Sequence, residues 1–194
     1  MTVVPALVSQ YGDVAATVAA EWYEEIRAAD VGGSFQARLS APTAPAAVSG
    51  TVRFAAGQLW ADNAAGTLAL VQAAMSRYIL DRGRDTIVDN TVADRRAAGW
   101  QRFTSPTGCD FCVMLSMRGA VYKESTAMFA SHDNCSCSAR PSWDRDAPEV
   151  PAIAYVASQK TSNMSESAQE QHRERVAVWI QQNRDQLDEF RAAL

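Results

Sequence analysis

Apolar residues in the first hundred positions recur every three or four residues, the spacing of one face of an α-helix. The first such stripe consists of Val14, Val18, Trp22 and Ile26. It predicts a helix over 11–30 that buries this stripe and ends before Gly32 and Gly33, because glycine readily terminates a helix. A loop marked by Pro42 and Pro45 follows.

Three further helices are predicted before residue 98. The apolar face of the second consists of Val48, Val52, Ala55 and Leu59, and that of the third of Leu68, Val71, Met75 and Ile79. A fourth helix over 84–97 carries Ile87, Val88 and Val92. Alanine is abundant throughout, which favours helix and the close approach of neighbouring helices. We therefore interpret 1–98 as a helical region.

The pattern changes at Gly99. Three short segments, 100–104, 120–124 and 138–143, resemble strands in composition, and Pro141 would hold the last of them to a sheet edge. Short helices are predicted between them, at 111–117 and 125–129. These segments make 99–143 a small β-rich unit.

The end of the chain is helical again. A proline-containing linker or arm over 144–164 leads to a predicted C-terminal helix over 165–194, where Ser167 and Glu170 have the spacing of a capping box. Its heptad-like stripe consists of Val176, Ile180, Asn183, Leu187, Phe190 and Leu194. The stripe fits a groove on a partner or the chain's own helices. The predicted fold class is α+β, mainly α.

Composition narrows the classes of function that fit the chain. Of its 194 residues 47% are hydrophobic and 21% are charged, which suffices for the core of one substantial domain. The formal net charge of −4 argues against a chain that binds nucleic acid over its whole surface. No apolar run approaches the ~18–20 residues that span a bilayer, and the first residues lack the features of a signal peptide. We therefore expect no membrane contact and folding in a reducing cytoplasm.

One stretch is rich in arginine. Its members are Arg77, Arg82, Arg84, Arg95, Arg96 and Arg102. Aspartates are interleaved with them, so we interpret the stretch as a solvated helix face with ion pairs between neighbouring turns.

All four cysteines and one of the two histidines lie between residues 109 and 137. Cys109 and Cys112 form one group, and His132, Cys135 and Cys137 form a second. Structural zinc sites are assembled from two such groups across a short excursion of the chain. We therefore predict a structural Zn²⁺ site with Cys109, Cys112 and Cys135 as ligands and either Cys137 or His132 as the fourth.

Other interpretations of these residues stay open. Four cysteines also make two disulfides in an oxidising environment, and buried free cysteines pack as small hydrophobic residues. A nucleophile among Cys112, Ser116 and Ser131 would pair with His132 in a hydrolase. We assign no catalytic residue.

The segment 99–143 resembles the C-terminal motif of phage Mu protein F-like minor head proteins, especially those of tailed phages of actinobacteria. The motif of that family is Cys-x2-Cys, then Gly-x-Val-Tyr, then His-x2-Cys-x-Cys. Gly119, Val121 and Tyr122 supply its middle part here, between the two cysteine groups. The order, the types and the spacing of these residues agree with the family motif at every position.

The resemblance implies a structural minor capsid protein. Its expected partners are the portal protein, the major capsid protein and packaged DNA, with multiple copies around a ring. Its expected location is the virion, inside the capsid near the portal vertex, after assembly in the host cytoplasm. Roles in head morphogenesis and in DNA packaging or ejection follow. The alternatives are a capsid maturation protease with a Cys/Ser–His pair, a label that some relatives carry, and a zinc-dependent nucleic-acid-binding module.

Overall fold

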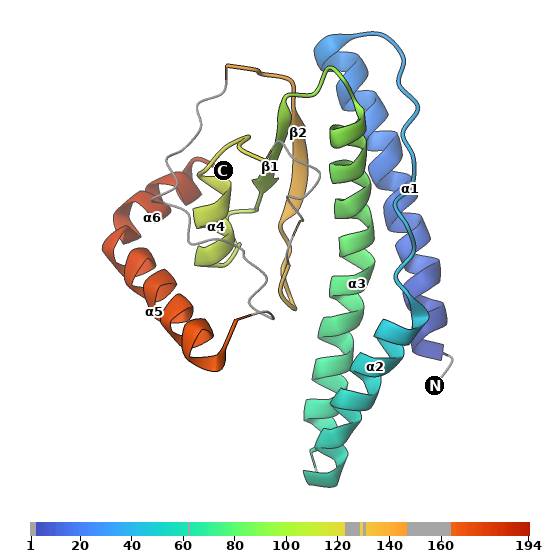
Figure 1. Cartoon of the computed structure of the whole chain (residues 1–194), viewed down its shortest axis with the longest axis vertical. Coiled ribbons are helices and arrows are strands. Elements are labelled where there is room, and N and C mark those ends of the chain that lie inside the picture. Colours follow the sequence, from blue (N-terminus) through green and yellow to red (C-terminus); the bar gives the residue numbers. More distant parts are fainter. Residues whose placement is uncertain (1–2, 62, 123–128, 130, 147–163) are drawn as a thin grey trace.

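The computed structural model describes residues 3–61, 63–122, 129, 131–146 and 164–194 (Figure 1). The helices are α1 (Val3–Val31), α2 (Pro45–Ala56), the 3₁₀ helix η1 (Gly57–Ala61), α3 (Ala64–Ala93), α4 (Asp110–Ser116), α5 (Glu166–Gln182) and α6 (Arg184–Ala192). The strands are β1 (Gly99–Phe103) and β2 (Ser138–Ser142). The chain is therefore mainly helical with a small antiparallel sheet, which confirms the predicted α+β class.

The sheet lies between two groups of helices. On one side α1 and α3 pack along each other, with α2 against their lower end (Figure 1). On the other side α4 packs on β1 and carries α5 and α6. The sheet therefore joins the long helices to the C-terminal part of the chain.

Small residues set the contact between α1 and α3. Gly83 of α3 approaches α1 so closely that a Cβ atom there would lie 3.2 Å from the carbonyl oxygen of Ala15. Ala16 and Ala19 of α1 are buried, as is Gly12 against the Arg82 side chain. Close helix approach needs such small side chains, because larger ones would hold the two backbones apart.

The predicted orientation of α1 is wrong. Val14, Val18 and Trp22 are 57%, 59% and 36% exposed, although the sequence analysis placed them in the core. Periodicity identified the helix correctly, but a second stripe of glycine and alanine runs along its other face. That stripe permits closer contact with α3, so it is buried instead and the larger apolar side chains point outward.

By length and composition, α1 is the one helix among the described residues that could cross a membrane. This differs from the expectation that no segment approaches the required length. Only 22% of its most apolar window is buried inside the protein. Core helices and N-terminal signal sequences share these properties, so the absence of membrane contact stays a prediction.

The two helices predicted over 67–97 are a single helix, α3. Asn63 caps its first turn, because its side-chain oxygen accepts a hydrogen bond of 2.9 Å from the backbone N–H of Gly66. Gly83 does not end it, because the close contact with α1 keeps this glycine within a continuous helix.

A buried ion pair joins the upper ends of α1 and α3. Arg27 Nε donates to Asp94 Oδ2 at 2.9 Å, and both side chains are almost fully buried. The same guanidinium donates to the carbonyl of Gly32 at 2.7 Å, just after α1 ends. Gly32 and Gly33 have φ angles of 69° and 74°, the left-handed region that favours glycine, so the predicted helix end is confirmed.

We expect this ion pair to make stability depend on pH. Burial alone would raise the pKa of Asp94, but the N–H of Arg96 and the guanidinium of Arg27 hold that pKa below its usual value. Since the pKa is lower in the folded state, the pair stabilises the fold above about pH 4 and is lost as the pH falls through the folded value. Asp94→Asn should lower the free energy of unfolding by about 2 kcal/mol at pH 7 and flatten its acid-side decline. Urea titrations at several pH values measure both effects, and parallel pH profiles for the two proteins would contradict the prediction.

The sheet follows the predicted strands in part. β1 and β2 pair from Gly99 opposite Ser142 to Phe103 opposite Ser138. On its other edge β1 meets Tyr122 among the described residues, through two backbone hydrogen bonds with Trp100 of 2.8 and 3.2 Å. Pro141 lies opposite Trp100, whose backbone N–H and C=O bond to Tyr122, so proline leaves no hydrogen bond of β1 unmade.

The short helix predicted at 111–117 is confirmed as α4. The remainder of the predicted strand, 123–124, and most of the helix predicted at 125–129 lie outside the described residues. So does most of the linker, 147–163.

The C-terminal helix is broken into two. The N-cap residue of α5 is Ser165, whose hydroxyl oxygen accepts a hydrogen bond from the N–H of Ala168, so the predicted capping box at Ser167 is wrong. Asn183 ends α5 and starts α6. Leu187 is fully buried against α4, and Phe190 packs beside it. This part of the predicted stripe therefore packs on the chain itself.

Leu187→Ala should destabilise the α4–α6 contact. The cavity and the lost apolar contacts should lower the free energy of unfolding by about 2–3 kcal/mol, a loss limited because α6 is terminal and can detach locally. Chemical denaturation measures the loss, with the exposed Val178→Ala on α5 as control. Equal effects of the two changes would show that Leu187 does not anchor α6.

Candidate metal centre

The first cysteine group lies at the start of α4. Cys109 is the N-cap residue, and its Sγ accepts a hydrogen bond of 3.4 Å from the backbone N–H of Cys112. Gly108 precedes it at a point where any Cβ atom would collide with the Thr104 side chain. The Cys-x2-Cys spacing thus places both sulfur atoms at one helix end.

The second group lies on the loop that leads into β2. Asn134 has a φ of 62°, a turn conformation that asparagine tolerates, and the N–H of Cys135 donates to the carbonyl of His132 at 3.2 Å. Arg84 of α3 holds this loop from behind, because its guanidinium donates to the carbonyls of Cys135 at 2.6 Å and Cys137 at 2.7 Å. The loop is therefore tied to the helical region.

All five predicted ligands come together. Cys112 Sγ lies 3.3 Å from Cys135 Sγ, 3.5 Å from Cys137 Sγ and 3.9 Å from His132 Nε2. Cys109 Sγ lies 3.2 Å from His132 Nε2. The atoms form two overlapping triads, each within 4.8 Å, that share Cys112. We call these five residues the Cys/His cluster.

The donor set fits zinc. All four cysteines are free, so their thiols are available as ligands. Zinc–sulfur bonds of ~2.3 Å in a tetrahedron separate the ligand atoms by roughly 3.7 Å. The separations of Cys112 Sγ from His132 Nε2, Cys135 Sγ and Cys137 Sγ are close to this value. Thiolates and imidazole are also ligands that zinc prefers. The fit extends to His132, whose Nδ1 lies 2.8 Å from the carbonyl oxygen of Asp133, which turns Nε2 toward the sulfurs.

The fourth ligand is not decided by geometry. His132 contacts Cys109 and Cys112, whereas Cys137 contacts Cys112 and Cys135. Arg102 Nη1 donates to Cys137 Sγ at 2.9 Å, a contact that stabilises a thiolate there. Neither set of four lies wholly within 4.8 Å, because the two triads share Cys112 alone, so the separations do not distinguish the two sets.

The surroundings of two cysteines in the cluster, Cys109 and Cys135, lower the pKa of their thiols and so favour the thiolate. Hydrogen bonding from the Cys112 thiol and N–H and from His132 lowers the pKa of Cys109 to about 5, although burial opposes this. Burial would lower the pKa of His132, but its contacts with the Asp133 carbonyl and Cys109 raise it. Hydrogen bonds among the cysteine side chains also raise the pKa of Cys112 and lower that of Cys135. Thiolates are the species that bind metals and attack electrophiles.

The alternative nucleophiles are engaged elsewhere. Ser116 Oγ donates to the carbonyl of Cys112 at 2.8 Å, and Ser131 Oγ donates to Asp81 Oδ1 at 2.5 Å. His132 instead meets the thiols of Cys109 and Cys112. A hydrolase at this site would therefore have to use Cys109 or Cys112 as the nucleophile and His132 as the base.

The sequence analysis misplaced three arginines. Arg82, Arg84 and Arg102 are 7%, 3% and 3% exposed, so the predicted solvated face is wrong for them. Arg84 and Arg102 lie over the ring of Phe129, at 5.2 and 3.9 Å from its centroid, and both bond to the second cysteine group. Their burial also leaves less basic surface for nucleic acid. The burial of Arg84 could have been predicted from the sequence, because Arg84 lies one helical turn before Ile87 and therefore on the same side of the helix.

A family of known proteins matches most of the chain. The sequence model of a family described as VG15 protein matches residues 1–159, a range that contains α1 to β2 and the whole Cys/His cluster. No curated protein and no solved structure matches the chain.

Proposed function

Because the chain belongs to the VG15 family of phage proteins, we propose that it is a structural minor capsid protein at the portal, stapled by a zinc ion in its Cys/His cluster. As a phage protein it belongs to the virion or to the infected host cell. The finer location, inside the head near the portal vertex, is part of the proposal, as are contacts with the portal protein and the major capsid protein.

The convergence of five soft ligands from two loops is the observation that carries this proposal. The cluster lies where α4, β2 and the end of the 131–137 loop meet, and Arg84 connects it to α3. A zinc ion there would cross-link these elements without chemistry of its own. Among its described residues the surrounding unit has a two-stranded sheet and one short helix, so a cross-link of this kind would add to the stability that its core supplies.

Two measurements test the proposal. Elemental analysis of the reduced, purified chain should find one zinc ion per chain. Folded protein without bound metal would refute the structural zinc site. Imaging of assembled particles with a tag on the C-terminal helix should place a few copies at the portal vertex. Particles that lack the chain would refute the capsid role while leaving the zinc result intact.

A capsid maturation protease is the second candidate, favoured by the contact of 3.2 Å between Cys109 Sγ and His132 Nε2. A lowered thiol pKa beside an imidazole is the arrangement of a cysteine nucleophile and its base. Cys109→Ser separates the two functions in infected cells. The protease predicts folded, zinc-containing protein with unprocessed head proteins, whereas the staple predicts lost zinc and normal processing in whatever particles form.

A further inference from the structure

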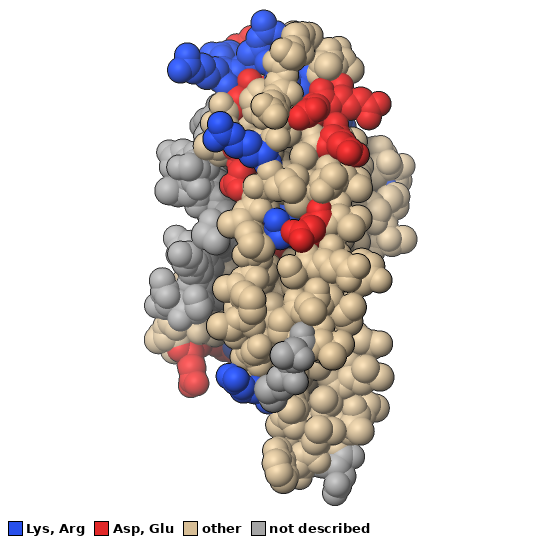
Figure 2. Space-filling view, turned by 90° about the vertical axis from the view of Figure 1, so that its right-hand side faces the viewer, with Lys and Arg blue, Asp and Glu red and all other residues tan. Residues whose placement is uncertain are grey.

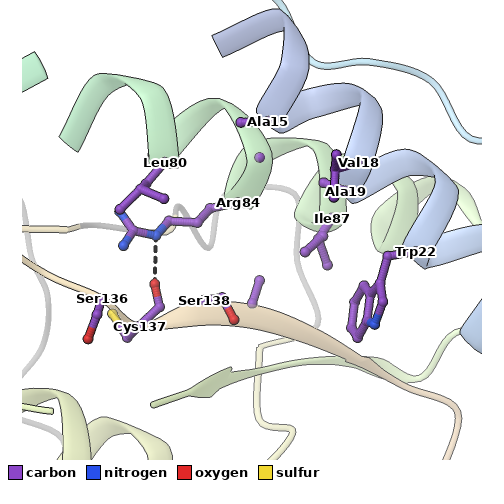
Figure 3. A pocket seen from close by; sticks show the side chains of 12 residues that line it. Ala15, Val18, Ala19, Trp22, Leu80, Arg84, Ile87, Ser136, Cys137 and Ser138 are labelled. Atoms are coloured by element: carbon purple, nitrogen blue, oxygen red, sulfur yellow. Dashed lines mark hydrogen bonds between the residues drawn. The ribbon is translucent and has the colours of Figure 1, made fainter. Parts of the chain in front are cut away.

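The two cysteine groups are held in place by different parts of the chain. Arg84 of α3 donates to the carbonyls of Cys135 and Cys137, and Figure 3 shows its side chain reaching Cys137 from the helix. The first group is held from the other side of the sheet, where α6 packs on α4 (Figure 1). A metal ion that binds both groups would therefore connect α3 with α6.

Cys109 is the cysteine of the cluster whose position burial does not fix. It is exposed, whereas the other three cysteines are buried. It also belongs to one triad alone, together with Cys112 and His132. Both choices of the fourth ligand nevertheless include Cys109 as a ligand. Another contact must therefore hold this sulfur within reach of a shared metal ion.

Two arginines of α6 bind the residues on either side of Cys109. Arg191 Nη2 donates to the carbonyl of Gly108 at 3.3 Å and to Asp110 Oδ1 at 2.8 Å. Arg184 Nη1 lies 2.9 Å from the other carboxylate oxygen, Asp110 Oδ2. The turn that carries the Cys109 sulfur is thus bound through both of its neighbours. We call Arg184, Arg191 and Asp110 the α6 clamp.

The apolar contact between α6 and α4 supports the clamp. Leu187 lies between the two arginines in the sequence and is fully buried in a cluster with Val113, Met114 and Leu115 of α4. Among the described residues α5 and α6 pack on α4 and on each other, and no contact of comparable extent joins them to α1, α2 or α3. A movement of α6 therefore acts on α4, and through α4 on the first cysteine group.

We infer that α6 positions Cys109 for the metal ion, with Arg191 as the principal positioning residue, so that docking of α6 and metal binding strengthen each other. Arg191 contacts both neighbours of Cys109, whereas Arg184 contacts one. Because coupling between two equilibria is reciprocal, release of α6 should weaken metal binding, and release of the metal should loosen α6. The inference deepens the proposed function and rests on its zinc site. α5 and α6 lie outside residues 1–159, so this support comes from beyond the part that the family model matches.

The zinc affinity of full-chain variants, measured by competition with a chelator of known affinity, tests the inference. Arg191→Met should bind zinc about fivefold to tenfold more weakly, a small loss for a residue behind a ligand because the clamp is partly exposed. Arg191→Lys keeps the charge without the planar guanidinium, so it should restore part of the lost affinity. Arg173→Met on α5, which breaks an exposed ion pair with Glu170, is the matched control and should bind like the wild type.

Salt separates the clamp from the apolar contact. Screening by about 1 M sodium nitrate weakens partly exposed ion pairs and leaves buried apolar contacts in place, so the affinity difference between wild type and Arg191→Met should shrink. On the α1 face, which lies across the sheet from α6, most charged side chains gather at the upper end (Figure 2), so screening there does not act on the clamp. A difference that salt leaves unchanged would overturn the role of the ion pairs.

Hydrogen exchange of the wild type tests the reverse coupling without any substitution. Removal of zinc by a chelator should speed the exchange of α6 amides, while the amides of α1 and α3 where these helices meet stay protected. Unchanged exchange in α6, or wild-type affinity in Arg191→Met, would overturn the inference and leave the zinc site standing. A wild type that binds no zinc would instead refute the proposed zinc site, and the inference with it. Circular dichroism identifies a variant that fails to fold, in which case the exchange experiment decides.

Discussion

Replacing Cys112 with serine is expected to abolish metal binding and to unfold the unit over 99–143. Cys112 is the residue that both triads share, and its sulfur contacts His132, Cys135 and Cys137. Neither choice of the fourth ligand can dispense with it. Structural zinc contributes apparent binding energies on the order of 10 kcal/mol in small domains. The serine variant should therefore lose zinc entirely, not partly.

Elemental analysis and tryptophan fluorescence measure this result. Trp100 is 1% exposed and stacks on Tyr122, so unfolding of the unit should shift its emission toward the red. Met114→Leu is the matched control, because Met114 lies on the same helix, is equally buried and is outside the Cys/His cluster. A Cys112→Ser protein with full zinc content and unchanged fluorescence would contradict the shared role of this sulfur.

Arg84→Met should lower the free energy of unfolding by about 3–5 kcal/mol. Arg84 is 3% exposed and donates to two loop carbonyls and to Asp81. Its loss leaves the carbonyls of Cys135 and Cys137 buried without this donor, and each charged hydrogen bond removed costs about 1.5–3 kcal/mol. Because those carbonyls belong to the second cysteine group, the variant should also bind zinc more weakly.

Arg77→Met provides the comparison. Arg77 of α3 also contacts the loop that carries the second cysteine group, through an ion pair of 2.6 Å with Asp133, but both side chains are partly exposed to solvent. Exposed ion pairs contribute at most about 1 kcal/mol, so this variant should stay near the wild type in urea denaturation and in zinc affinity. Equal losses for the two variants would show that burial of Arg84 does not determine its contribution.

Several parts of the fold follow from local spacing. The helical character of α1 to α3, α5 and α6, and the places of β1, β2 and α4, were predicted because turn residues and periodic apolar positions act within a few residues of one another. The prediction failed where a segment could either continue a helix or end it. Two separate helices were predicted on either side of Gly83, yet α3 continues through this residue because α1 lies against it.

The sequence by itself determined which residues form the Cys/His cluster, since two short motifs carry all the thiols and spacing predicts that they converge. Only the tertiary structure decided which face of α1 is buried, that Arg84 and Arg102 support the cluster from inside, and that α6 packs on α4. The physical reason is the same in each case. Ligand spacing is a property of adjacent residues, whereas burial depends on which small residues let distant helices approach, and that contact joins positions far apart in the chain.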